Sequence, residues 1–204
     1  MKLYDSYRAP NPRRVRWAMA EKGIDDIEIV NVDLFKGEQR SAEYMAKAGI
    51  PLTPALELDD GTVITESLAI CRYLESVYPE PNLFGRDARE TAVIEMWTRR
   101  AEHLLANRLM MVVRHTHPAL AALETQVAAV GEVSRKEAER SLALFDEQLG
   151  KHAFIAGDRL TIADIIAAVG LDFARLVKFA PDGYPNLARW REAMMAREAA
   201  KAGT

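Results

Sequence analysis

The chain has 204 residues, of which 49% are hydrophobic and one, Cys71, is cysteine. That length and composition suit one large domain or two small ones with a proper apolar core. A single cysteine excludes an intramolecular disulfide, a Cys-x-x-Cys redox pair and a cysteine-rich zinc site, so thiol chemistry must use Cys71 or a sulfur carried by a ligand. With 27 basic and 30 acidic residues the formal net charge is −3, which disfavours a nucleic-acid partner.

The hydropathy pattern also disfavours a membrane protein. The longest uncharged apolar run covers about residues 165–171, whereas a bilayer span needs about 20 residues. The sequence Met-Lys-Leu-Tyr-Asp-Ser-Tyr-Arg at the N-terminus lacks the apolar stretch of a signal peptide. We therefore expect no membrane partner and a cytoplasmic location.

The first eighty residues alternate between strand and helix patterns. Asp59-Asp60-Gly61 joins two short strand-like runs and predicts a tight antiparallel hairpin. The strand that begins near Lys2 and the second strand are separated by a helical stretch, so we expect a crossover connection and a parallel pair. The predicted order is βαβαββα, with strands at 2–5, 27–33, 55–58 and 62–65 and helices at 13–22, 41–48 and 66–77.

The segment 79–87 carries two prolines and a glycine and is predicted to be a linker. It separates an α/β domain at 1–78 from a domain at 88–204 in which no convincing strand occurs. In that second domain we expect only helices, at about 88–115, 134–149 and 161–179 and from 186 onwards.

Several motifs of common enzyme classes are missing. The chain has no G-x-G-x-x-G, no G-x-x-x-x-G-K-[ST], no G-x-S-x-G and no H-E-x-x-H, which argues against nucleotide cofactors, serine-hydrolase chemistry and zinc-protease chemistry. His115 and His117 suggest a metal site, but they more simply mark the end of a long helix, where cations suit the dipole. We expect no metal.

The segment from Thr53 to Ile70, with Thr53-Pro54-Ala55-Leu56-Glu57-Leu58 and Ile64-Thr65-Glu66-Ser67-Leu68, resembles the glutathione-binding half of cytosolic glutathione S-transferases. The resemblance extends over essentially the whole chain, because a thioredoxin-like βαβαββα domain followed by an all-helical domain is that family's architecture. Thr161-Ile-Ala-Asp164 is a further mark of the family. Its [ST]-x-x-[DE] pattern predicts a capping box, and we assign it a structural role only.

The resemblance implies a set of glutathione-binding residues. Pro54 suits the first position of a strand, because proline cannot donate to the sheet; the family keeps this peptide cis and pairs the main chain of Thr53 with the cysteinyl part of glutathione. Glu66 and Ser67 open a helix whose N–H groups favour an anion. By resemblance Ser67 binds the γ-glutamyl carboxylate with Glu66 nearby, and a plain helix cap is the alternative. Lys36 is a candidate for the glycyl carboxylate.

The sequence offers several candidates for the residue that activates the glutathione sulfur. Family members use a hydroxyl or thiol just after the first strand, and the corresponding position here is Ala9. Asn11 is similar to the asparagine that contacts the sulfur in bacterial and fungal members. Asn11 also fits an N-cap with Pro12 at the first helical position, which requires no function. Tyr7 and Ser6 are alternative hydroxyl donors near the same turn.

Two further expectations concern charge and sulfur. Arg8, Arg13, Arg14 and Arg16 crowd the start of the first helix, where cations oppose the dipole. We expect most of them to be surface charge, with some attracting the carboxylates of glutathione. Cys71 lies in an amphipathic helix and is expected to be a buried small hydrophobe.

The resemblance implies a glutathione transferase that uses glutathione as co-substrate and conjugates it to an electrophilic, largely apolar small molecule. It also implies a homodimer. Two alternatives remain open. One is a glutathione-dependent disulfide or peroxide reductase, and the other is a non-catalytic binding protein with the same fold, which the loss of a hydroxyl at Ala9 favours.

Overall fold

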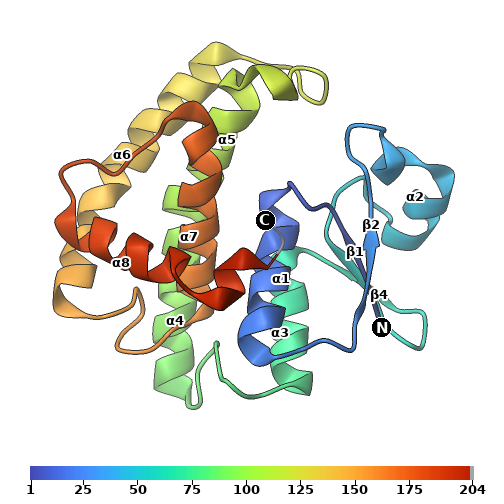
Figure 1. The fold of residues 1–204 in the computed structure, drawn as a ribbon, viewed down its shortest axis with the longest axis horizontal. Coiled ribbons are helices and arrows are strands. Elements are labelled where there is room, and N and C mark those ends of the chain that lie inside the picture. Colours follow the sequence, from blue (N-terminus) through green and yellow to red (C-terminus); the bar gives the residue numbers. More distant parts are fainter. Residues whose placement is uncertain (203–204) are drawn as a thin grey trace. The chain divides into compact units, whose positions relative to one another are not determined.

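The computed structural model describes residues 1–202 and divides the chain into two compact units (Figure 1). The N-terminal unit is Met1–Pro81 together with Lys201 and Ala202, and the C-terminal unit is Asn82–Ala200. The division falls inside the segment 79–87 that the sequence predicts as a linker. Each unit has its own layers and core.

The N-terminal unit has the predicted βαβαββα order, and its small mixed sheet with helices is a thioredoxin-like domain. The strands and helices are one residue or a few shorter or longer than predicted, which is the usual uncertainty at element ends. They are β1 (Lys2–Asp5), α1 (Pro10–Lys22), β2 (Glu28–Asn31), α2 (Ala42–Ala48), β3 (Ala55–Glu57), β4 (Val63–Thr65) and α3 (Ser67–Val77), with a short 3₁₀ turn η1 (Glu38–Arg40) before α2.

The four strands form one sheet in the order β2-β1-β3-β4. β1 and β2 are parallel and are joined by α1, whereas β3 pairs antiparallel with both β1 and β4. The β3–β4 connection is the predicted hairpin: Gly61 has a φ of 82°, and the backbone N–H of Thr62 donates to the Asp60 carboxylate at 2.8 Å. Only glycine adopts that φ without strain, so the Asp-Gly pair determines the turn.

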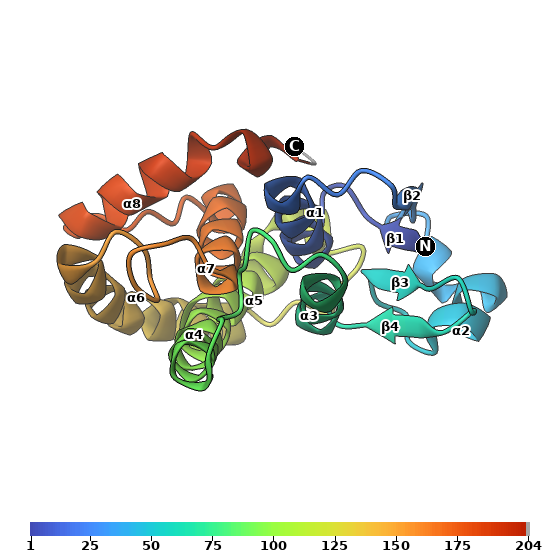
Figure 2. The same ribbon diagram turned by 90° about the horizontal axis from the view of Figure 1, so that it is seen from below.

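Helices cover both faces of this sheet. α1 and α3 lie side by side on one face and α2 lies on the other (Figures 1 and 2). The alternation of β1 explains the two layers, because Leu3 is fully buried toward α1 and α3 while Tyr4 packs edge-on against Tyr44 of α2, with ring centroids 6.0 Å apart.

The C-terminal unit is all-helical over the residues that the structure describes. As predicted, the chain forms a long helix after residue 88, then three further helices. The long helix consists of α4 (Ala88–Arg100), a π-helical segment η2 (Ala101–Ala106) and α5 (Asn107–Thr116). The three further helices are α6 (Ala128–Lys151), α7 (Ile162–Phe173) and α8 (Pro185–Met195). Short 3₁₀ turns are η3 (Pro118–Leu120), η4 (Ala174–Val177) and η5 (Glu198–Lys201).

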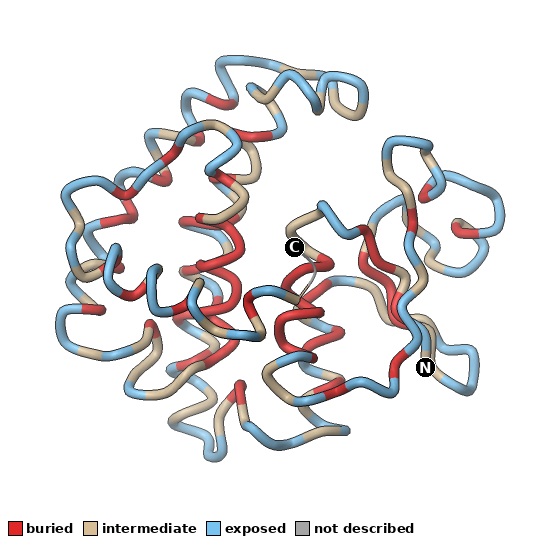
Figure 3. The backbone as a smooth tube through the Cα atoms, in the orientation of Figure 1, coloured by how far each residue is buried: buried red, intermediate tan, exposed pale blue. Residues whose placement is uncertain are grey.

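α7 is the centre of this unit's core. Every residue from Ile162 to Leu171 is buried, as the unbroken buried stretch in Figure 3 shows. A helix that is apolar all round must be surrounded, and α7 contacts α4, α5, α8 and η2. Gly170 allows the closest of these approaches, because a Cβ there would lie 2.8 Å from the Cα of Ala106.

The predicted capping box at the start of α7 is present and confirms the structural role given to Thr161 and Asp164. The buried Asp164 carboxylate accepts hydrogen bonds from the backbone N–H and the hydroxyl of Thr161, both at 2.9 Å. It also accepts from the backbone N–H of Ile155 at 2.8 Å and from the indole N–H of Trp190 at 3.0 Å. One carboxylate therefore joins the start of α7 to α8 and to the loop before α7.

Two helix boundaries differ from the predictions. α6 begins at Ala128 and not near Ser134. Gly131 lies within this helix, and its missing side chain lets α6 approach Thr116 closely. A Cβ at Gly131 would lie 2.5 Å from Cγ2 of Thr116. The last predicted helix turn of 161–179 is a 3₁₀ turn that ends at Val177. Among the described residues, no helix is both long and apolar enough to cross a bilayer.

Candidate functional site

The sheet register brings three chain segments to one end of the sheet. Tyr4 near the end of β1 pairs with Ala55, the first residue of β3, and Ala55 pairs with Thr65, the last residue of β4. The chain therefore leaves β1 toward α1, enters β3 and leaves β4 toward α3 at the same place. We call this the site end of the sheet. It carries the turn before α1, the Thr53–Pro54 peptide and the N-terminus of α3.

A buried ion pair stabilises the turn between β1 and α1. The Asp5 carboxylate at the end of β1 contacts the Arg16 guanidinium of α1, and these side chains are 0% and 4% exposed. Arg16 also donates to the carbonyl of Tyr7 at 3.0 Å, and its guanidinium lies 5.5 Å from the Tyr7 ring centroid. The backbone N–H of Ala9 donates to the carbonyl of Ser6 at 2.9 Å. These contacts fix the backbone from which Ser6 and Tyr7 project.

Within that turn the two predicted hydroxyl donors differ in exposure. Ser6 is buried, with 7% of its surface exposed, whereas Tyr7 is 53% exposed. The structure thus places both near the start of α1 but gives only Ser6 a sheltered position.

The alternative that Asn11 is the N-cap of α1 is wrong. The helix begins at Pro10 with Ala9 as its N-cap, so Asn11 is the second helical residue, and no side chain caps this end. The physical reason is the pair of prolines, Pro10 and Pro12, which suit the first turn because N–H groups there have no intrahelical partner. Consequently Asn11 supplies the one backbone N–H among the first three helical positions. Its side-chain Oδ1 is buried without a hydrogen-bond partner among the described residues.

The Thr53–Pro54 peptide is cis, as the resemblance implied. Pro54 is buried and immediately precedes β3, while Thr53 is partly exposed. Proline at this place needs no sheet donor, and the main chain of Thr53 lies at the site end of the sheet, just before Ala55.

The start of α3 has a strained backbone at Glu66, the hydroxyl of Ser67 and the guanidinium of Arg14 close together. Glu66 precedes the first helical residue with φ 69° and ψ 117°, a conformation that is rare outside glycine. Such backbone strain is concentrated at functional sites. Glu66 is exposed and makes no side-chain cap, so the plain-cap reading of Glu66 is wrong. Ser67 is 6% exposed, and Nη1 of Arg14 lies 3.5 Å from its hydroxyl oxygen.

The arginines of α1 correct a prediction made from the sequence. Arg13, Arg14 and Arg16 were expected to be mostly surface charge, but they are 8%, 2% and 4% exposed. Each has an identified contact: Arg13 lies over the Trp17 ring at 5.8 Å, Arg14 contacts Ser67, and Arg16 pairs with Asp5. Arg14 is therefore a candidate site residue, which the sequence did not single out from the other arginines. Its spacing within a run of arginines gave no signal, because only the packing of α1 against α3 brings it to Ser67.

Lys36 lies on the loop after β2. That loop also leaves the site end, since Asn31 pairs with Asp5. The Lys36 side chain is 74% exposed, and its ammonium lies 3.5 Å from the Asp33 carboxylate. Lys36 therefore follows a strand that ends at the site end of the sheet, and Asp33 is a competing partner for any incoming carboxylate.

Cys71 is buried in α3, as expected, and its thiol is free. Burial raises the pKa of the Cys71 thiol to about 12, although the positive charges of Arg14 and Lys22 oppose that shift. A thiol of that pKa is protonated at neutral pH and is a poor nucleophile. Any sulfur that reacts at the site end must come from a ligand. No group of three or more His, Cys, Asp or Glu side chains within residues 1–202 is arranged to hold a metal ion.

Comparisons with known proteins agree with this architecture. Residues 9–77 match the family profile described as the glutathione S-transferase N-terminal domain, and residues 104–198 match that of the C-terminal domain. The chain is 34% identical over 206 residues to glutathione S-transferase 2 of Saccharomyces cerevisiae, covering 98% of this chain and 88% of that protein. It is also 30% identical to maleylacetoacetate isomerase of Rattus norvegicus, covering 97% of this chain and 88% of that one.

Solved structures give the same result. The crystal structure of Gtt2 from Saccharomyces cerevisiae superposes with a TM-score of 0.92 at 35% identity, covering all of both chains. A glutathione S-transferase domain-containing protein of Marinobacter aquaeolei gives a TM-score of 0.91 at 40% identity, covering 98% of this chain and 99% of that one. Both family profiles, together with a relative 34% identical over nearly the whole chain, establish the relationship. The chain belongs to the glutathione S-transferase family.

Proposed function

We propose that the protein binds glutathione at the site end of the sheet and transfers its thiolate to an electrophilic, largely apolar small molecule. The observation that carries the proposal is the register Tyr4–Ala55–Thr65, which brings the turn before α1, the Thr53–Pro54 peptide and the start of α3 together. Family membership supports glutathione as the ligand. A homodimer and a cytoplasmic location are part of the same proposal.

The two ends of glutathione suit different parts of this site. A carboxylate is favoured at the N-terminus of α3, where unpaired N–H groups, the Ser67 hydroxyl and the guanidinium of Arg14 converge. Glu66 is exposed beside it and suits the γ-glutamyl ammonium. The backbone of Thr53 can pair with the extended peptide in the manner of an added strand. Lys36 can reach the glycyl carboxylate if it exchanges its contact with Asp33.

In this arrangement the glutathione sulfur lies near the start of α1. A free thiol has a pKa of about 8.5, and donors together with a helix N-terminus lower it so that thiolate forms at neutral pH. Asn11 lies in that first turn and has two kinds of donor, its backbone N–H and the NH₂ group of its side-chain amide. We assign Asn11 as the residue that stabilises the thiolate, with Ser6 and Tyr7 as the alternatives.

The test of binding is calorimetric titration with glutathione of the wild type, Ser67→Ala and Ser76→Ala. Both serines lie on α3, but Ser76 is exposed and donates to the carbonyl of Arg72. Loss of a hydrogen bond to a charged group is expected to weaken binding about tenfold in Ser67→Ala. Ser76→Ala should match the wild type. Equal affinities in all three proteins would count against the site.

A second candidate is glutathione-dependent cis–trans isomerisation. It is favoured by two relatives named maleylacetoacetate isomerase, from Rattus norvegicus and Pseudomonas aeruginosa, which are 30% and 31% identical to this chain. In such a reaction the thiolate adds to the cis double bond, which becomes a single bond and rotates, and elimination of the thiolate re-forms the double bond in the trans configuration. The same thiolate site therefore serves both reactions.

The stoichiometry of glutathione separates these reactions. Conjugation of 1-chloro-2,4-dinitrobenzene consumes one glutathione per product and releases chloride, whereas isomerisation of maleylacetoacetate consumes none. Reduction of a disulfide consumes two and yields glutathione disulfide. We expect enzyme-dependent consumption of one glutathione per conjugate. Turnover with maleylacetoacetate alone would favour the isomerase, and no turnover above buffer with any of them would favour a binding protein.

A further inference from the structure

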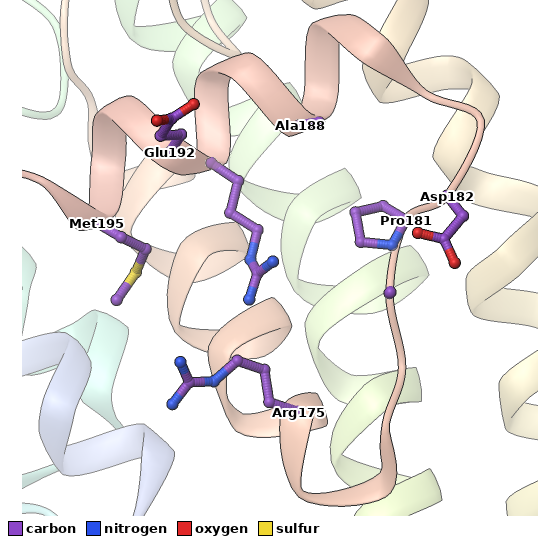
Figure 4. Close-up of a pocket in the computed structure, with 8 residues that line it drawn as sticks. Arg175, Pro181, Asp182, Ala188, Glu192 and Met195 are labelled. Carbon is purple, nitrogen blue, oxygen red and sulfur yellow. The ribbon is translucent and has the colours of Figure 1, made fainter.

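The C-terminal unit contains a recess that the glutathione chemistry does not use. It has a volume of about 360 Å³ and lies between η4, the loop that follows it, and α8 (Figure 4). All of its lining residues belong to the C-terminal unit, whereas the glutathione residues named above belong to the N-terminal unit. Its volume is within the range of small-molecule pockets.

Two arginines line the recess. The Arg191 side chain is half-buried, and its Nε is buried without a hydrogen-bond partner among the described residues. The Arg175 side chain is 65% exposed and uses its Nε on the Asp172 carboxylate at 3.0 Å, which leaves its terminal nitrogens in solvent at the mouth of the recess. Figure 4 shows that the Arg175 guanidinium extends from η4 toward α8, across the recess. The buried Nε–H of Arg191, without a partner, costs free energy, which an anion at the recess would recover.

The acidic residues at the recess do not neutralise these arginines. Asp182 and Glu192 are both exposed. In Figure 4 their carboxylates are turned away from the Arg175 guanidinium, and no ion pair joins either of them to Arg175 or Arg191 within residues 1–202. The two guanidinium groups are therefore not neutralised by the acidic residues that line the recess, and Arg191 is the more buried of the two.

The remaining wall is apolar. Pro181 is a buried residue of the loop after η4, and Ala188 and Met195 line the recess from α8. Methionine is a flexible apolar side chain that adapts to ligands of irregular shape. The combination of an apolar wall with two guanidinium groups suits a molecule that has an apolar body and a single oxyanion head.

We propose that this recess binds a small organic oxyanion, a carboxylate or phosphate carried on an apolar body, between Arg175 and Arg191. Arginine forms paired hydrogen bonds with either head group, so both are members of the same ligand class. The proposal does not depend on the function proposed for the site end of the sheet.

Titration calorimetry with 2-naphthoate, 2-naphthyl phosphate and the neutral 2-naphthylmethanol tests this proposal. We expect at least one of the two anions to bind with a dissociation constant below about 1 mM, and the alcohol to bind at least about tenfold more weakly. Whichever anion binds more tightly identifies the head group. If neither anion binds up to 10 mM, or if the alcohol binds as well as the anions, the proposal is overturned.

Variants locate the site. Arg191→Gln and Arg175→Gln should each weaken binding of the anion about tenfold, and Arg191→Lys should retain only part of the affinity, because an ammonium cannot make the paired contact. Arg140→Gln is the matched control, since Arg140 is exposed on α6 and does not line the recess. Thermal unfolding of each variant shows whether it is folded. Folded Arg191 and Arg175 variants that bind as tightly as Arg140→Gln would overturn the assignment.

Discussion

At the scale of single residues, Asn11 shows how a change of one helical position alters an interpretation. The sequence allowed it to be either a cap or a contact to sulfur. The structure removes the first option, because Ala9 is the N-cap and the Asn11 side chain makes no cap hydrogen bond. A buried amide oxygen without a partner costs free energy in the folded protein and stabilises nothing. The NH₂ group of the same amide is the part of the side chain that can donate to a thiolate.

We therefore predict that Asn11→Ala changes the free energy of unfolding by less than about 0.5 kcal/mol. Its conjugation rate at saturating glutathione should fall about tenfold or more, because a donor to the developing thiolate is lost. Urea unfolding and steady-state kinetics measure the two effects. Ser41→Ala is the control: Ser41 accepts a hydrogen bond from the Tyr44 backbone N–H at 3.1 Å as a true N-cap. It should lose about 1 kcal/mol and keep its activity. A large loss of stability with unchanged rate in Asn11→Ala would contradict this account.

At the scale of elements, the start of α7 depends on one buried carboxylate. Asp164 accepts four hydrogen bonds, from Ile155, Trp190 and two groups of Thr161. Burial raises the pKa of this carboxyl, and the donors around it oppose that shift. Replacing it leaves several buried donors unpaired at once.

Asp164→Ala is expected to lower the free energy of unfolding by about 3 kcal/mol or more, because each unpaired buried donor costs about 1 kcal/mol. Trp190→Phe removes only one of the four donors and should cost about 1 kcal/mol of hydrogen bonding. Thermal and urea unfolding of both variants measure the difference. If Asp164→Ala were no less stable than Trp190→Phe, the carboxylate would not be the centre of this network.

The contact between α7 and η2 depends on a missing side chain. A Cβ at Gly170 would lie 2.8 Å from both Cα and Cβ of Ala106, and backbone cannot move aside as a flexible side chain can. Gly170→Ala should therefore destabilise the protein by about 1–3 kcal/mol through overpacking. Gly150→Ala in α6 is the matched control, since its nearest neighbour is the end of the Asn186 side chain at 3.0 Å. Alanine's better helix propensity should leave that variant near neutral in an unfolding experiment. Equal stabilities would contradict the packing argument.

The same elements show how far sequence reasoning extends. The order of strands and helices, the Asp-Gly hairpin and the capping box were predictable, because each depends on local chemistry within a few residues. The earlier start of α6 was not predictable from local pattern, because a glycine such as Gly131 disfavours a helix and its place here is explained by the close approach of Thr116 on α5. Likewise Pro10 and Pro12 are equally good starts for α1, and the packed structure selects Pro10.

The candidate site divides in the same way. Thr53, Pro54, Glu66 and Ser67 are predicted through family resemblance, and the register of the sheet explains why they lie at one end of it. Arg14 could not be singled out from the other arginines of α1, because its contact with Ser67 joins residues 53 positions apart. Contacts of that separation follow from tertiary packing and leave no local pattern.

At the scale of the whole molecule, the single cysteine and its burial separate the protein's own thiol from the proposed chemistry. Burial raises the pKa of the Cys71 thiol from its ordinary value of 9.0 to about 12 and that of the Tyr44 hydroxyl from 10.0 to about 12. In the pH range between the unfolded and folded values, the unfolded chain has lost these protons and the folded chain keeps them. Unfolding then releases protons, so the free energy of unfolding falls as pH rises.

Each such group contributes a slope of about −1.4 kcal/mol per pH unit in that range. We predict that the stability of the wild type falls between pH 9 and pH 10.5 and that Cys71→Ala loses about 2 kcal/mol less over the same interval. Urea unfolding at several pH values measures both curves. Cys71→Ala should be less stable than the wild type at pH 8 because of lost packing. Parallel pH profiles of the two proteins would show that the thiol does not titrate as its burial requires.

The central claim is that glutathione binds at the site end of the sheet with its sulfur at the start of α1. A crystal structure of the complex with glutathione tests this most directly. We predict that the sulfur lies within about 3.5 Å of the side chain or backbone N–H of Asn11, with the γ-glutamyl carboxylate on the hydroxyl of Ser67. A sulfur beside Tyr7 or Ser6 would contradict the role of Asn11, and glutathione bound away from this end of the sheet would contradict the claim as a whole.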